Sequence, residues 1–183
     1  SKAKPLTCAV CTLESNLLNI EEINEWHSFK SFEDFLSSPG PWIAGLDFPF
    51  GQSRKFVNNM GWPKSWKEYI GKVAEFGRDE FKNMINAYKE FRPYGDKEHR
   101  RLTDIAAGSI SPQKIYGIPV GLMFFEGAPR LLKAGTTLPG MFDGDPNRIV
   151  VESYPGVLVR NLIGRRKYKH DDMRKQTIEQ AEA

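Results

Sequence analysis

Residues 42–51 read WIAGLDFPFG, and this stretch decides which fold the sequence favours. It opens with a short apolar run, which is typical of a buried strand in the parallel sheet of an α/β protein. Asp47 follows that run directly, and Pro49 and Gly51 then end the strand. The stretch therefore predicts a buried strand with a carboxylate at its C-terminal end.

A second stretch of the same kind, residues 148–155, reads RIVVESYP and places Glu152 near the end of a β-rich run. Ligands of open α/β sheets bind outside the carboxyl ends of the strands. If the two strands are parallel neighbours, Asp47 and Glu152 would stand about 5 Å apart. Carboxylates at that spacing can share divalent cations. The alternative is structural: Asp47 braces the following turn, and Glu152 pairs with an arginine.

The rest of the chain predicts strands and helices around these two stretches. Two strands over residues 6–14 and 17–29 would form an antiparallel pair, joined by a tight turn at Ser15-Asn16. A long polar loop is expected over residues 94–118, where Gly, Ser and Pro are frequent. Apolar residues at helical spacing predict helices within the ranges 31–36, 53–93, 119–133 and 156–163.

Strands that alternate with helices imply parallel pairing, whereas the opening strand pair implies antiparallel pairing. We therefore expect an α/β fold with one mixed sheet and helices on both faces. A length of 183 residues suits a single domain, 1–183. The helical segment at about 53–135 would be an insertion between the two acid-bearing strands.

The composition and the net charge of the chain narrow the classes of protein to which it could belong. Hydrophobic residues make up 40% of the chain, charged residues 27%, and the net charge is +3. No apolar run approaches the about 20 residues that span a bilayer, and the N-terminus is polar, so the sequence predicts a cytoplasmic protein without a membrane segment. The basic run at residues 165–170, RRKYKH, suggests a nucleic-acid partner that it contacts through phosphates. The alternative for this run is a solvated loop or helix end.

Two adjacent arginines precede an acid in the stretch 100–104, RRLTD. Arg100 and Arg101 are candidate phosphate-binding residues, because a guanidinium can bind a phosphate through two hydrogen bonds. The alternative is that they provide surface charge or pair with Asp104. The neighbouring His99 is expected to be a bystander. Aromatic residues at helical spacing are expected to pack in the core rather than stack on bases: Trp62, Trp66, Tyr69, Phe76 and Tyr88.

Residues 45–51 and 151–155 resemble the two internal motifs of a family named "domain of unknown function 429", classed as predicted RNase H-like nucleases. Residues 100–104 resemble its middle segment, and the resemblance extends over nearly the whole chain in the same order. It implies an RNase H-like fold with strand order 3-2-1-4-5 and bound Mg²⁺ or Mn²⁺. Asp47 would end the fourth strand, which the helical insertion follows, and Glu152 would end the fifth. The chain departs from the family pattern by lacking its first strand, which carries an Asp, and its final acidic helix.

The resemblance and the paired acids together favour a metal-dependent nuclease that hydrolyses phosphodiester bonds. Two alternatives remain open. The first is a non-catalytic RNase H-like domain that binds nucleic acid or protein. The second is an actin-like small-molecule phosphotransferase, since the sugar kinases of that class share the same core.

Overall fold

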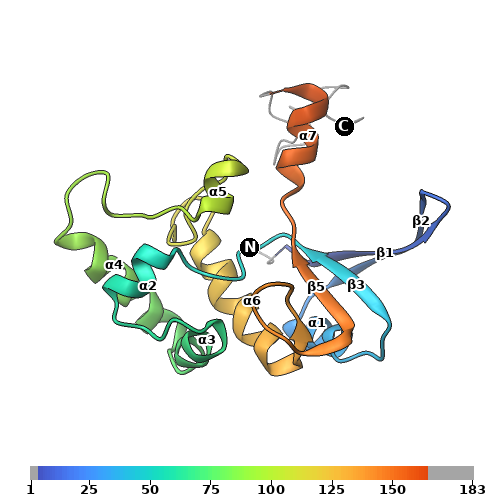
Figure 1. Ribbon diagram of the computed structural model, residues 1–183, viewed down its shortest axis with the longest axis horizontal. Helices are drawn as coiled ribbons and strands as arrows, with labels where there is room; N and C mark the ends of the chain where they lie inside the picture. Colours follow the sequence, from blue (N-terminus) through green and yellow to red (C-terminus); the bar gives the residue numbers. More distant parts are fainter. Residues whose placement is uncertain (1–3, 165–183) are drawn as a thin grey trace.

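The computed structural model describes residues 4–164, so the basic run 165–170 and the tail that follows lie outside the described residues. The described chain is mixed α/β, which confirms the predicted class (Figure 1). Its elements are β1 (Leu6–Glu14), β2 (Leu17–Trp26), α1 (Phe29–Leu36), β3 (Trp42–Leu46), α2 (Arg54–Asn59), α3 (Trp66–Ala74), α4 (Arg78–Glu90), α5 (Leu102–Ala106), α6 (Val120–Ala134), β4 (Thr136–Thr137), β5 (Asp145–Glu152) and α7 (Pro155–Ile163).

Strands β1 and β2 form the antiparallel hairpin that the sequence predicts. Its two-residue turn has a positive φ at both positions, 48° at Ser15 and 68° at Asn16. A turn of this kind matches the right-handed twist of the flanking strands, and asparagine tolerates the left-handed conformation better than most residues. Strand β2 ends at Trp26, earlier than predicted, because the chain then turns at Ser28 into α1.

Strands β3, β5 and β4 form a parallel sheet in which β5 is central. Leu46 lies opposite Glu152 in the register of β3 and β5. One step further along, the N–H of Ser153 donates to the carbonyl of Leu46 at 2.9 Å. The two acid-bearing strands are therefore parallel neighbours, as predicted.

The expectation of one mixed sheet is wrong for the described strands, because the hairpin and the parallel strands belong to two separate sheets. Within residues 4–164, the edge of β3 that faces away from β5 has no strand partner. A hydropathy pattern predicts where a strand lies and which face it buries. It does not specify which strands pair with one another, and for this reason the prediction of a single sheet was wrong.

Helices α2 to α6 fill the chain between β3 and β5, and Figure 1 shows α2 to α5 at the end of the molecule opposite the hairpin. Of the aromatic residues predicted to pack in the core, Trp62 is 5% exposed and Trp66 and Tyr69 are 6% exposed, whereas Phe76 and Tyr88 are partly buried against the core. The indole N–H of Trp66 donates to the carbonyl of Phe50 at 2.7 Å. This bond fixes the helical segment against the turn that follows β3. Among the described helices, none has the length and apolar character needed to cross a membrane.

The predicted loop 94–118 contains a short helix, α5, that the sequence analysis missed. The carboxylate of Asp104 accepts the backbone N–H of Arg101 at 2.8 Å and so satisfies a donor at the start of this helix. Polar composition concealed the helix, because its stability comes from this local contact and not from an apolar face. The two-residue strand β4 was also missed, since it is too short to show any periodicity.

The turn after β3 packs closely on helix α6. A Cβ atom added at Gly127 would lie 2.2 Å from Cε2 of Phe48, closer than any real contact. Glycine is therefore needed on this face of α6 for the aromatic ring to fit. Because Phe48 follows Asp47 directly, the same packing holds the candidate site in position.

Candidate metal and phosphate site

The two predicted carboxylates come to the same edge of the parallel sheet. Asp47 follows β3, and Glu152 is the last residue of β5, opposite Leu46. Both line a pocket of about 1350 Å³ between the sheet edge and the helical segment. The structure therefore brings together the two acids that the sequence selects from positions far apart in the chain.

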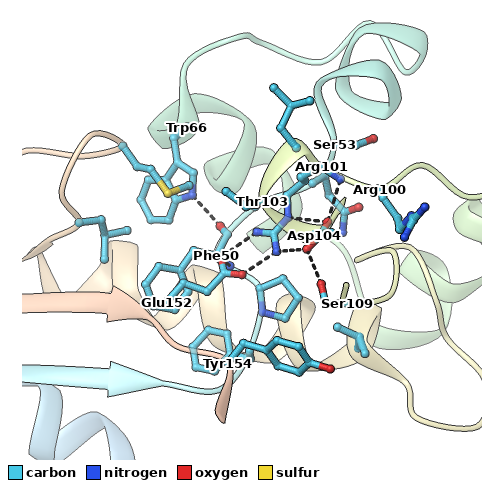
Figure 2. A pocket seen from close by; sticks show the side chains of 18 of the residues that line it. Phe50, Ser53, Trp66, Arg100, Arg101, Thr103, Asp104, Ser109, Glu152 and Tyr154 are labelled. Carbon is cyan, nitrogen blue, oxygen red and sulfur yellow. Dashed lines mark hydrogen bonds and ion pairs between the residues drawn. The ribbon is translucent and has the colours of Figure 1, made fainter. Parts of the chain in front are cut away.

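Glu152 is held by three hydrogen bonds, which Figure 2 shows in part. Its Oε2 accepts the backbone N–H of Phe50 at 3.0 Å. Arg101 reaches both carboxylate oxygens, Nη2 to Oε1 at 2.6 Å and Nη1 to Oε2 at 2.7 Å. The structural alternative for Glu152, pairing with an arginine, is thus present in the structure.

The same guanidinium also binds Asp104. Nε of Arg101 lies 2.9 Å from Oδ2 of Asp104, and Nη2 lies 2.6 Å from Oδ1. The hydroxyl of Ser109 donates to Oδ1 at 3.1 Å, and Asp104 is only 2% exposed. Arg101 therefore lies between a buried carboxylate on its own helix and a more accessible one on β5.

Burial and hydrogen bonding shift the pKa values of Arg101 and Asp104. Burial alone would lower the pKa of Arg101, but its hydrogen bonds with Asp104 and Glu152 raise that pKa above its usual value. Burial would raise the pKa of Asp104, but the hydrogen bonds from Arg101 bring it below its usual value. The cluster combines one guanidinium with two carboxylates.

The donor chemistry of the two acids fits a hard divalent cation. Mg²⁺ commonly takes one or two carboxylates and completes its shell with water and substrate phosphate. Among residues 4–164, however, no group of three or more His, Cys, Asp or Glu side chains could hold an ion. A cation that binds between Asp47 and Glu152 would also need the oxygens that Arg101 contacts.

Arg100 differs from Arg101 in its contacts. It is exposed at the wall of the pocket, and no described carboxylate lies within ion-pair distance of it. Five basic side chains line the pocket against three acidic ones, so the lining favours an anionic ligand. The basic residues are Arg54, Lys55, Lys64, Arg100 and Arg101.

The sequence pattern does not indicate Arg54, Lys55 and Lys64 as residues of this site. They belong to the helical segment, where isolated basic residues usually face solvent, and only the folding of that segment over the sheet edge brings them to the pocket. His99, expected to be a bystander, is buried, and its Nε2 lies 2.6 Å from the hydroxyl of Tyr88. Neither of these two side chains lines the pocket, so the contact holds the loop against α4.

Comparison of the chain with protein-family models, with curated proteins and with solved structures found no match. The resemblance to the predicted RNase H-like nucleases stays a prediction that depends on three short motifs.

Proposed function

We propose that this protein is a metal-dependent phosphodiester hydrolase of RNase H-like fold that acts on nucleic acid. The observation that carries the proposal is the parallel register of β3 and β5, which places Asp47 and Glu152 at one sheet edge beside a pocket with a basic lining. Paired carboxylates and basic side chains are the components that metal-assisted phosphoryl chemistry requires.

The arrangement of the strands supports the RNase H-like part of the proposal. In the order 3-2-1-4-5, the hairpin and the parallel pair would lie on either side of one central strand. Within residues 4–164, the outer edge of β3 is unpaired, and Ile43 on that strand is 73% exposed. An apolar strand with an open edge is a template for a further strand, and the family order has a strand at that position.

In sites of this class, bound cations activate the attacking water and stabilise the leaving oxygen. Asp47 and Glu152 are the residues that would hold them. Arg54, Lys64 and Arg100, which have no carboxylate partner among the described residues, would neutralise the phosphates on either side of the scissile bond. The sheet would thus provide the residues that hold the cations, and the helical segment would provide the contacts to phosphate.

The experiment is cleavage of labelled single- and double-stranded oligonucleotides in the presence of Mn²⁺ or Mg²⁺. Asp47→Asn is expected to lower the rate by at least about 100-fold, because even the outer-shell partners of metal ligands cost roughly 10–100-fold when they are lost. Asp79→Asn is the matched control, since Asp79 is an exposed acid on α4 outside the pocket. Cleavage that persists in Asp47→Asn, or no cleavage by the unaltered protein, would overturn the proposal.

One observation favours a second candidate, a non-catalytic domain that binds nucleic acid. Glu152 already has a cationic partner in Arg101, whereas Arg100 has no carboxylate partner among the described residues. Under this alternative, oligonucleotide binding would survive Asp47→Asn and would weaken in Arg100→Gln, and no cleavage would occur with any variant. The unaltered protein therefore distinguishes the two candidates, because it cleaves oligonucleotides under the first and only binds them under the second.

A further inference from the structure

Arg101 contacts two carboxylates that are anchored very differently. Asp104 is three residues away on the same short helix, its side chain is 3% exposed, and it also accepts bonds from a backbone N–H and from Ser109. Glu152 lies on β5 and also accepts a backbone N–H, that of Phe50 at 3.0 Å, but its side chain is 30% exposed. One partner is therefore part of the fold, whereas the other is open to the pocket.

This difference in burial determines which of the two carboxylate contacts of Arg101 another cation can replace. Separating Arg101 from Asp104 would leave a buried carboxylate unpaired, which is costly. Separating it from Glu152 leaves a partly exposed carboxylate that water or another cation can compensate, while Arg101 keeps its pairing with Asp104. The pair can thus separate by rotation of the Glu152 side chain, while the rigid guanidinium keeps Nε and Nη2 on Asp104.

We infer that Arg101 is an exchangeable counter-cation of Glu152, which a divalent cation must displace to bind at the site. The inference depends on the function proposed above, because it concerns the same carboxylates. Arg101 and the cation bind Glu152 in mutually exclusive ways, so Arg101 lowers the affinity of the ligand-free pocket for the cation. After displacement, Nη1 of Arg101 no longer contacts Glu152 and is available to an anionic oxygen of the substrate.

The test measures the affinity for Mn²⁺ from the electron paramagnetic resonance signal of the free ion. The informative variant is the double substitution Arg101→Gln with Asp104→Asn. It removes one positive and one negative charge, so the net charge of the pocket is unchanged while Glu152 is released. We expect Mn²⁺ to bind about tenfold more tightly, within the range usual for coupled binding equilibria. Arg100→Gln is the control, because it removes a neighbouring charge that does not contact Glu152, and its effect should be smaller.

Folding of each variant is checked by its thermal transition. If the double variant does not fold, Arg101→Lys takes its place, because lysine can pair with Asp104 but cannot bridge both carboxylates through a fork, and it should bind Mn²⁺ more tightly than the unaltered protein does. Unchanged or weaker binding, together with loss of binding in Glu152→Gln, would overturn the role of Arg101 and leave the metal site intact. Absence of Mn²⁺ binding in every variant would instead overturn the proposed function itself, and this inference with it.

Discussion

Individual side chains in the pocket are positioned by shared contacts rather than by isolated pairs. Arg101 illustrates this point, because its guanidinium joins α5 to β5 through Asp104 and Glu152. The sequence predicts Arg101 and Glu152 as candidates for either a functional or a structural role, and Asp104 as a possible partner of Arg101. The structure shows that Arg101 takes the structural pairing with both acids at once. Sequence spacing could indicate the contact three residues away, but not the contact across 51 residues.

The surroundings of His99 predict how the stability of the protein depends on pH. Burial lowers the pKa of His99 below its usual value, and nearby Lys55 lowers it further, while Asp96 at 3.8 Å opposes the shift. The folded state therefore binds a proton at His99 less readily than the unfolded chain does. The stability that neutral His99 contributes is fully present above its unfolded value of about 6.5, and it is lost as the pH falls through the folded value.

We expect the free energy of unfolding to fall between pH 7.5 and pH 5.5, and to fall less in His99→Gln. Urea denaturation at both pH values measures the difference. Equal losses in the two proteins would show that His99 does not contribute to the pH dependence.

At the scale of helices and strands, the sequence predicts the segments that their own hydrophobic pattern marks. The strand over 42–46 and the helix that starts near 120 agree with the structure, because apolar periodicity and proline boundaries mark them. Helix α5 was not found, since its stability depends on one capping carboxylate and on Arg101. The fit of the turn after β3 against α6 was likewise invisible, because nothing near Gly127 in the sequence indicates that Phe48 lies over it.

That fit predicts opposite effects for two helix glycines. Gly127→Ala should destabilise the protein by about 1–3 kcal/mol, because the added methyl displaces the Phe48 ring from a packed position. Gly71→Ala in α3 is the matched control, since nothing lies within 4 Å of its added Cβ. It should stabilise the helix by up to about 1 kcal/mol. Thermal or urea denaturation measures both changes, and a stabilising Gly127→Ala would contradict the packing described for α6.

At the scale of the whole molecule, the candidate site depends on contacts between distant segments. The two acids could be selected from the sequence because each follows a strand of recognisable pattern, and strand ends in α/β sheets converge on ligand sites. The division of the strands into two sheets could not be predicted, because pairing partners are not encoded in local periodicity. The basic wall of the pocket also arises from tertiary structure, since Arg54 and Lys64 reach it only when the helical segment folds over the sheet edge.

The central claim is that Asp47 and Glu152 jointly hold a divalent cation. Anomalous diffraction from crystals soaked in Mn²⁺ tests this claim most directly. We predict an anomalous peak within about 2.0–2.6 Å of carboxylate oxygens from both residues, with Glu152 turned away from Arg101 and Arg101 still bound to Asp104. An ordered site without a peak, in which Arg101 retains both oxygens of Glu152 at saturating Mn²⁺, would contradict the account.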